Sequence, residues 1–360
     1  MCGITASMEA TVGTDVSIVE GPYLRDILDQ PRALRATLDG LEISNELRAA
    51  ASRLQKGDFR CVALTGMGSS FHALHPSNLE LIEKGFVSTM VETSELVHHQ
   101  SRLFDPKTLI IAVSQSGQSV EMVRLLEKNA GRATILAVTN TAKSALAANA
   151  NAAILTAAGE EFSVSCKTYT TALMGLKWLT TGLCGGDFQA LRSELSGASQ
   201  TAGAYLEGWA DHVESISRRL SGIHRLFLVG RGRSLAAVGT GALTIKESDH
   251  FSAEGMSSAA FRHGPFEMLG GETFVIVYEG ENPTSELNLR MLRDIRDEGG
   301  RAELVGEESD FVSLKLPVVP QSVRPIVEAL PGQMMTLALA AQVGREPGRF
   351  ERATKVTTIE

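Results

Sequence analysis

The chain has 360 residues, of which 43% are hydrophobic and 21% charged, with a net charge of -8 and a pI near 5.6. This composition is too apolar for a disordered chain, and the length suffices for about two domains. The acidic balance, with no local cluster of Lys and Arg, argues against a nucleic-acid-binding surface. An anionic ligand would therefore have to be held by local dipoles.

Cysteine usage and the N-terminal residues bear on location. Cys2, Cys61, Cys166 and Cys184 show no C-x-x-C spacing and are too sparse for a disulfide framework. The N-terminus lacks a basic start followed by an apolar run, and no stretch reaches the roughly 18 apolar residues of a membrane span. We therefore expect a cytoplasmic protein with no membrane partner.

Apolar spacing predicts two helices after a leader of residues 1–21. Leu24, Ile27 and Leu28 recur at helical spacing, and a second helix follows Pro31. From Arg60 the pattern changes to short apolar runs alternating with longer helical ones, which predict strands at residues 61–65, 87–91, 109–113, 134–138 and 152–155. Such alternation indicates an α/β fold, with a parallel sheet covered by helices on both faces.

The same alternation returns in the second half of the chain. A helix from Lys167 to Leu183 and a longer one from Phe188 to Leu220 come first. Further strands are then predicted at residues 225–229, 274–278, 302–305 and 312–316, and helices at 236–250 and 323–343. We therefore expect a second α/β domain.

Two turns rich in serine and glycine follow buried strands in the first half. One is Gly66-Met-Gly-Ser-Ser70, and the other, Ser114-Gln-Ser-Gly-Gln-Ser119, opens a helical pattern. Backbone N–H groups and hydroxyls would gather at that helix N-terminus, where an anion is stabilised without Lys or Arg. The density of serines exceeds what a helix cap requires. Together the turns predict a site for a small phosphorylated molecule.

The first turn has a counterpart in the second half. Its Gly-x-Gly-x-Ser pattern at residues 66–70 recurs at 230–234, an offset of 164 residues, again after a predicted strand. This recurrence suggests an internal duplication. In the second copy the glycines could equally serve close packing alone.

These pieces, taken in order, resemble the sugar isomerase (SIS) domain family, and most closely the isomerase half of glucosamine-6-phosphate synthase. The resemblance runs from about Pro22 to Glu360 and rests on Asp26-Ile-Leu-Asp-Gln-Pro31, Gly66-Met-Gly-Ser-Ser-Phe-His-Ala73, Ser114–Ser119, Lys167-Thr-Tyr-Thr-Thr171, Gly230-Arg-Gly232, Lys246-Glu247, Arg262-His-Gly-Pro265 and Lys355-Val-Thr-Thr-Ile-Glu360.

The resemblance implies a domain organisation. It predicts two tandem SIS domains, each a five-stranded parallel sheet between helices in a flavodoxin-like, doubly wound arrangement. With the helix pair included, the first domain would cover residues 22–200 and the second 201–345. Residues 346–360 would form a tail that contributes to the active site. A homodimer with a shared active site is also implied.

The resemblance further assigns site residues, matched motif by motif. Phosphate contacts fall on Ser70, Ser114, Gln115, Ser116 and Ser119, and further substrate contacts on Gly68, Ser69 and Ser165. Several donors converging on three phosphate oxygens suit a dianion. The catalytic residues would be Glu247, His263 and Lys355.

Each of the three catalytic assignments has a chemical rationale and a plainer alternative. Glu247 could move a proton between C1 and C2 of an open-chain sugar, or could be an exposed partner of Lys246 or Arg233. His263, supplied by the neighbouring subunit, could open the sugar ring, or could only bond a backbone carbonyl. Lys355 could reach the site from the tail, or could be solvated.

The leading hypothesis is an enzyme that acts on a sugar 6-phosphate, or an amino- or N-linked one, by proton transfer through an enediol or enolamine. Three reactions share that core: aldose–ketose isomerisation, deamination of an amino-sugar phosphate, and cleavage of a fructosamine 6-phosphate. The sequence has no counterpart of the synthase's glutaminase domain, which favours the two reactions that release an amine. Thr240 and Thr244 replace a glutamate and a lysine of the synthase, which weakens the case for ammonia addition.

Other classes of function receive less support. A sugar-phosphate-sensing regulator is the main rival, but residues before Pro22 are too few for a helix-turn-helix. His72 and His75, like His98 and His99, lack a third ligand at metal spacing, and neither Gly-x-Gly turn extends to a dinucleotide motif. We therefore expect no metal and no cofactor.

Overall fold

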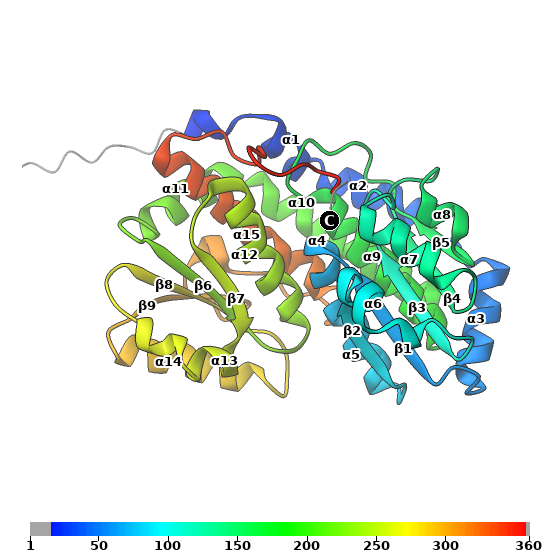
Figure 1. Ribbon diagram of the computed structural model, residues 1–360. Coiled ribbons are helices and arrows are strands. Elements are labelled where there is room, and N and C mark those ends of the chain that lie inside the picture. The colour runs from blue at the N-terminus through cyan, green and yellow to red at the C-terminus, as the bar shows by residue number, and fades with distance from the viewer. Residues whose placement is uncertain (1–15, 358–360) are drawn as a thin grey trace, which may run out of the picture.

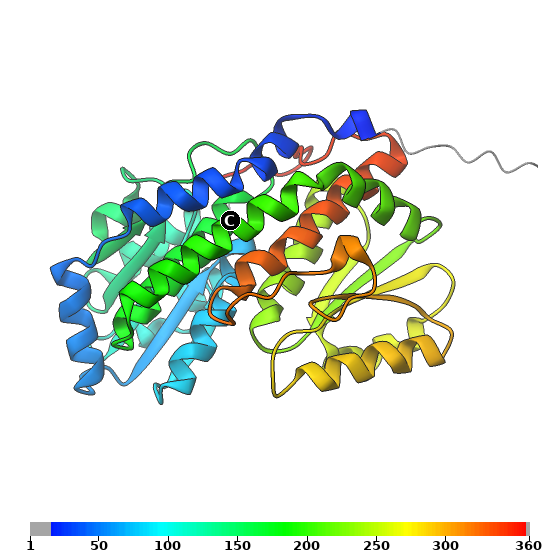
Figure 2. The ribbon, with the colours of Figure 1, turned by 180° about the vertical axis from the view of Figure 1, so that it is seen from behind.

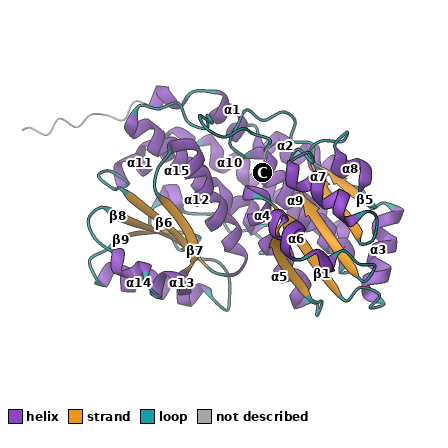
Figure 3. Cartoon of the chain, in the orientation of Figure 1, coloured by secondary structure: helices purple, strands orange, loops and turns teal. Residues whose placement is uncertain are grey.

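The structure, a computed structural model, describes residues 16–357 and shows two α/β halves side by side, each built on its own parallel sheet (Figures 1 and 3). Most of the leader and the last three residues, which end the tail motif, lie outside the described residues. Cys61, Cys166 and Cys184 are free thiols.

The first sheet has five parallel strands in the order β2-β1-β3-β4-β5. The predicted strands are correct to within one residue at each end: β1 Cys61–Gly66, β2 Ser88–Glu92, β3 Thr108–Val113, β4 Thr134–Thr139 and β5 Ala152–Leu155. Helices intervene at α4 Gly68–His72, α5 Leu74–Glu83, α6 Thr93–His99, α7 Val120–Asn129 and α8 Ala145–Asn149. This is the flavodoxin-like strand order that the resemblance implies.

The second sheet has four strands, in the order β7-β6-β8-β9, and this corrects the expected five. Its strands are β6 Arg225–Gly230, β7 Ala253–Ser257, β8 Thr273–Tyr278 and β9 Arg301–Val305. The strand predicted at 312–316 is wrong, because Val312–Leu314 forms a 3₁₀ helix and only Lys315 bridges to Gly306. Strand β7 was not predicted, because its sequence Ala-Glu-Gly-Met-Ser is too polar to show an apolar run.

Helices complete both halves. In the first, α1 Pro22–Leu28 and α2 Gln30–Gly40 form the predicted N-terminal pair, followed by α3 Asn45–Gln55, and α9 spans Lys167–Leu183 as predicted. The long helix expected at 188–220 is two helices, α10 Phe188–Glu207 and α11 Trp209–Arg219, which meet at Gly208. The second half adds α12 Leu235–Asp249, α13 Ser258–Arg262, α14 Ser285–Asp297 and α15 Arg324–Val343.

Alternating side chains of each sheet face two different cores. Leu109 and Ile111 of β3 join one large core that spans both halves, whereas Ile110 and Ala112 face a smaller core beneath α6 and α7. Strand β8 divides in the same way, with Val275 and Val277 facing α13 and α14. Helices α9, α10, α12 and α15 fill the shared core, and α10 crosses the back of the molecule from one half to the other (Figure 2).

Helix α10 runs across residue 200, the predicted boundary between the domains, and packs on both α2 and α15. The boundary itself stays a prediction. Among the described residues, α15 is the one helix long and apolar enough to cross a membrane, yet it lies almost wholly buried in the shared core.

Helix α12 of the second half is held tightly against its neighbours. A Cβ atom at Gly239 would lie 2.2 Å from Nδ1 of His72 on α4, and one at Gly332 of α15 would lie 3.4 Å from the Cα atom of Gly241. A side chain at Gly239 would therefore collide with His72, whereas the distance at Gly332 is an ordinary van der Waals contact. Gly239 thus lets α12 lie close to α4 of the first half, and Gly241 and Gly332 face each other where α12 packs on α15.

Candidate active site

A cavity of about 240 Å³ lies at the carboxyl ends of β1 and β3, where the strand order of the first sheet reverses. Doubly wound sheets bind ligands at this position, because the turns after neighbouring strands diverge there. The wall consists of residues from both serine turns, α7, the loop before α9, α12 and the tail: Met67, Gly68, Ser69, Ser70, Val113, Ser114, Gln115, Ser116, Ser119, Glu121, Met122, Ser163, Ser165, Glu247, Phe350, Ala353, Thr354, Lys355, Val356 and Thr357.

The loop at residues 114–119 presents its hydroxyl groups in a fixed arrangement. Ser114 Oγ accepts a hydrogen bond from the Gly117 amide at 3.0 Å, Ser116 Oγ accepts from the Gln118 amide at 3.2 Å, and Ser119 Oγ accepts from Met122 at the start of α7 at 3.4 Å. A serine oxygen that accepts a bond keeps its own O–H as a donor. The loop can therefore direct three O–H donors at an anion.

Gly117 allows this loop its shape. Its φ is +61°, and a Cβ atom would lie 2.3 Å from Ser144 Oγ. The Ser114 amide donates to Val138 and the Leu146 amide donates to Gly117, so the neighbouring strand and helix anchor both ends of the turn. The loop is therefore preorganised for a ligand rather than dependent on one for its conformation.

Glu247 enters the cavity from the last turns of α12. Burial raises its pKa to about 7, while the nearby ammonium groups of Lys246 and Lys355 oppose the rise. A carboxyl group with a pKa near 7 can both take and return a proton near neutral pH. The alternative in which Glu247 is an exposed partner of Arg233 is wrong, because Arg233 pairs with Glu281 and Glu83.

Residues of the tail, Phe350 and 353–357, line one side of the cavity. The Gly348 amide donates to Ser248 Oγ at 2.8 Å, directly after Glu247, and the Gly348 carbonyl accepts from Val164 at 3.4 Å. Further along, the Thr357 carbonyl accepts from the Val120 amide at 3.1 Å, at the first residue of α7. The tail thus bridges the helix that carries Glu247 and the helix that follows the serine loop.

Of the eleven predicted site residues, the structure brings ten to the wall of this one cavity and leaves out His263. His263 follows α13 on the second half, is exposed, and does not line the cavity of its own chain. The roles assigned to all eleven stay predictions. For the residues that gather, the common position explains how segments up to 287 positions apart, from Gly68 to Lys355, could serve one ligand.

Sequence reasoning missed several groups at the site. Ser163 lines the cavity, and Glu161 behind it holds the tail lysine, with 2.8 Å between Lys355 Nζ and Glu161 Oε2. Glu121, on the first turn of α7, also lines the wall. Nothing in the spacing of Gly159-Glu-Glu-Phe162 marks Glu161, since two adjacent carboxylates before a loop are usually solvated.

The described residues include no group of three His, Cys, Asp or Glu side chains that could hold a metal ion. His72 and His75 stack on each other beside Phe71. Burial lowers the pKa of His72 to about 4, and its Nδ1 lies without a partner against α12. His72 is therefore a neutral packing residue at ordinary pH.

A larger hollow of about 640 Å³ lies on the second half, away from these groups. Its arginines are occupied: Arg301 donates to three backbone carbonyls, and Arg219 and Arg296 both pair with Glu303. The smaller cavity is thus the better candidate site, because its donors are directed into it.

Comparison with known proteins agrees with this geometry. Residues 59–181 match the sequence profile of the SIS domain. This segment is a SIS domain. Over 94% of its length the chain is 28% identical to a protein of Pyrococcus horikoshii named glutamine–fructose-6-phosphate aminotransferase (isomerizing), across 351 aligned residues. The chain spans 57% of that relative's length.

Two solved structures share the fold of this chain. The C-terminal domain of glucosamine-fructose-6-phosphate aminotransferase from Francisella tularensis superposes with a TM-score of 0.80 at 21% identity, over 90% of this chain and 97% of that one. Tagatose-6-phosphate ketose/aldose isomerase from Escherichia coli gives a TM-score of 0.79 at 21% identity, over 92% and 96%. The resemblance to the SIS family and to the isomerase half of the synthase is therefore confirmed.

Proposed function

We propose that this SIS protein is an enzyme that acts on a sugar 6-phosphate or amino-sugar 6-phosphate by moving a proton between C1 and C2. The observation that carries the proposal is that Glu247 and the hydroxyl loop at residues 114–119 line the same cavity. The loop would bind the phosphate group at one end, so that the carboxylate meets the other end of an open-chain sugar.

The chemistry requires few groups. The carboxylate of Glu247 takes the proton from C2 of an aldose or C1 of a ketose, the C–H bonding pair forms the C1–C2 double bond, and the carbonyl pair moves onto its oxygen, which takes up a proton to give the enediol. Glu247 then returns its proton to the neighbouring carbon, while the hydroxyl on the carbon that lost its hydrogen releases its proton and becomes the new carbonyl, so no net charge or atom is gained. For a 2-amino sugar, the analogous enolamine becomes an imine, and water then releases ammonia.

Isomerisation and amine release fit the site better than ammonia addition. Thr244 lies one turn before Glu247 and is buried, and its hydroxyl donates to the Gly241 carbonyl at 3.1 Å. That position therefore supplies no amine to activate a sugar carbonyl. Cleavage of a fructosamine 6-phosphate uses the same proton transfer and is the alternative substrate class.

Ring opening would come from a second copy of the chain. His263 does not line the cavity of its own chain, and the resemblance assigns that residue to a neighbouring subunit. A homodimer that shares its active sites would supply it. An imidazole can accept the anomeric proton and donate to the ring oxygen.

Deuterium exchange tests the proton transfer whichever product forms. The protein is incubated in D₂O with fructose 6-phosphate, glucosamine 6-phosphate or fructoselysine 6-phosphate, and loss of the C1 and C2 proton signals is followed by NMR. We expect exchange with at least one of them, together with aldose phosphate or free amine. Glu247→Gln should lower the exchange rate by about 10³-fold or more and leave binding of the phosphosugar intact.

The pH dependence provides a second check. Because the carboxyl group must be ionised to act as a base, the exchange rate should rise with pH and level off above about 7, where Glu247 has lost its proton. An absence of exchange on all three compounds, together with binding that Glu247→Gln does not alter, would identify a sugar-phosphate sensor and refute the enzyme.

A further inference from the structure

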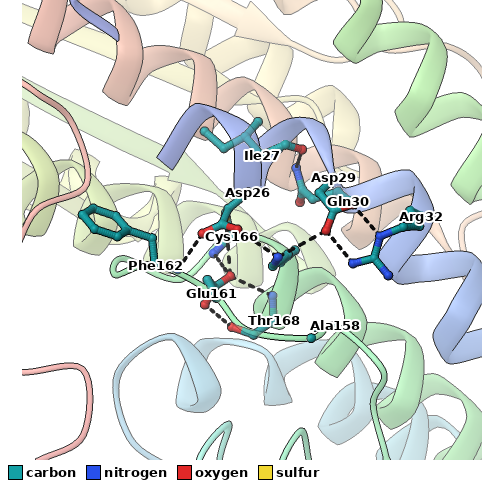
Figure 4. Close-up of polar contacts among 12 residues, drawn as sticks. Asp26, Ile27, Asp29, Gln30, Arg32, Ala158, Glu161, Phe162, Cys166 and Thr168 are labelled. Atoms are coloured by element: carbon teal, nitrogen blue, oxygen red, sulfur yellow. Dashed lines mark hydrogen bonds and ion pairs between the residues drawn. The ribbon is translucent and has the colours of Figure 1, made fainter. Parts of the chain in front are cut away.

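Glu161 has a carboxylate that is fully buried yet surrounded by donors. Its Oε1 accepts from the amides of Cys166 at 3.0 Å and Thr168 at 2.9 Å, and its Oε2 accepts from the Thr168 hydroxyl at 2.6 Å (Figure 4). The side chain is 0% exposed. These three bonds arise from the start of α9 and satisfy the carboxylate on one side.

Cys166 Sγ also lies 3.5 Å from Oε1, and a further donor comes from nearly 200 residues along the chain. Lys355 Nζ lies 2.8 Å from Glu161 Oε2 and 2.8 Å from the Ser163 carbonyl oxygen. Of the three N–H groups of an ammonium, two are thus directed at the loop between β5 and α9. The third is left for a molecule in the cavity that Lys355 and Ser163 both line.

We propose that Glu161 is a positioning residue that draws the tail lysine into the cavity wall and makes Lys355 a hydrogen-bond donor to the substrate rather than a free amine. The inference rests on the proposed function, because it concerns the same site. An ammonium group, whose N–H bonds are directed at a carboxylate and a carbonyl, has no free lone pair on its nitrogen. It can donate to a sugar oxygen, but it is poorly arranged to attack a carbonyl carbon.

Holding the loop between β5 and α9 in place does not explain why two buried carboxylates, Asp26 and Glu161, are present there. Asp26 of α1 also serves the same loop: its Oδ2 accepts from the Phe162 amide at 2.6 Å, and its Oδ1 lies 2.8 Å from Lys167 Nζ (Figure 4). These two contacts of Asp26 already fix the loop to α1 and α9. Glu161 instead makes the contact to the tail. In this ion pair the side chain of Lys355, which lines the cavity, is 24% exposed.

The energetics permit this contact to break and form again. An unpaired carboxylate in the interior is costly, but without Lys355 the Glu161 group would keep its three donors from α9. The tail could therefore leave to admit a substrate and return without unfolding the loop.

The test uses Glu161→Gln, Lys355→Met and the double variant, with Asp26→Asn as the matched control. Trypsin cleavage after Arg349 and Arg352, followed by mass spectrometry, reports whether the tail is docked and needs no substrate. We expect Glu161→Gln and Lys355→Met each to speed cleavage at least tenfold, the double variant to add nothing, and Asp26→Asn to leave the rate within twofold of the original protein.

Steady-state kinetics with a phosphosugar that the protein converts distinguish a positioning role of Glu161 from a general loss of structure. If Glu161 acts through Lys355, kcat should fall by a similar factor in each single variant and no further in the double variant. Additive losses would overturn the proposal, because they would mean that Glu161 acts apart from the lysine.

Acetylation of the unaltered protein tests the same proposal without any variant. Lys355 should react with acetic anhydride at least tenfold more slowly than the exposed Lys246, because its nitrogen is hydrogen-bonded and mostly covered. Equal rates would overturn the proposal even if Glu161→Gln failed to fold. Proteolysis and acetylation need no catalytic turnover, so they test the role of Glu161 by themselves. If the proposed function is wrong, only the deuterium-exchange experiment will show it.

Discussion

The two glycine turns, one in each half of the molecule, share a backbone and differ in what surrounds it. Gly68 and Gly232 both adopt left-handed φ values, +52° and +60°, and the preceding Met67 and Arg231 are both extended. The backbone correspondence supports the internal duplication suggested by the sequence.

The two turns differ in the loops that lie beside them. In the first half, the strand β3 ends in serines whose hydroxyls face a cavity. In the second half, the equivalent strand β8 ends in Glu279-Gly-Glu281, and Arg233 of the turn pairs with Glu281 and with Glu83. A phosphate would meet carboxylates there. The second turn instead connects the two halves through the ion pairs of Arg233.

The serine at the end of each turn shows the same divergence. Ser70 lines the cavity, whereas Ser234 is buried and donates to Glu328 Oε1 at 2.9 Å. Identical residues at equivalent positions thus serve different purposes, because the helix packed against the second turn supplies an acceptor for its serine.

The largest expected difference concerns the loops after the turns. Replacing both Ser114 and Ser116 by alanine should weaken binding of fructose 6-phosphate at least about 100-fold, because a hydrogen bond to a charged group contributes about 1.5–3 kcal/mol. Titration calorimetry measures the effect. The matched pair Thr284→Ala and Ser285→Ala, at the start of α14 after the equivalent loop of the second half, should leave affinity unchanged, and a similar loss there would remove the distinction between the turns.

A smaller effect, on the pH dependence of folding stability, is expected from Glu328, which lies beneath the second turn. Burial raises its pKa to about 7. Because the folded-state pKa lies above that of the unfolded chain, the protein loses stability as pH rises from about 4.5 through 7, by up to about 3 kcal/mol.

Glu328→Gln should remove this loss. It should match the original protein in urea unfolding at pH 5 and exceed it at pH 8, since the amide keeps an acceptor for Ser234. A stability difference that is the same at both pH values would contradict the assignment.

The smallest effect compares the two left-handed glycines directly. A Cβ atom at Gly68 or Gly232 would be uncrowded, with nearest atoms at 3.6 and 3.9 Å, so alanine at either should cost only the conformational strain of about 1 kcal/mol. Urea midpoints should therefore fall equally in both variants. Fructose 6-phosphate binding should weaken only in Gly68→Ala, and equal weakening in both would argue against a site confined to the first turn.

Local patterns predicted much of this architecture. The five strands of the first sheet are apolar runs bounded by turn residues, and α9 follows from unbroken helical residues, so both were located closely. Prediction failed where local signals were weak or misleading. Strand β7 is half polar, and Gly208 divides a helical pattern that looks continuous.

The parallel sheets and the hydroxyl-rich loop could be inferred from the order of the amino acids, because each depends on neighbours in the chain, and the resemblance to the SIS family pointed to the acidic residue on α12. Three features of the site could not: Glu247 shares a cavity with residues 114–119, its burial raises its pKa to about 7, and Glu161 holds Lys355. These features arise when the chain folds and α12 packs against α4, where Gly239 leaves room for His72. Contacts between such distant segments leave no periodic trace in the sequence, so only the folded molecule reveals them.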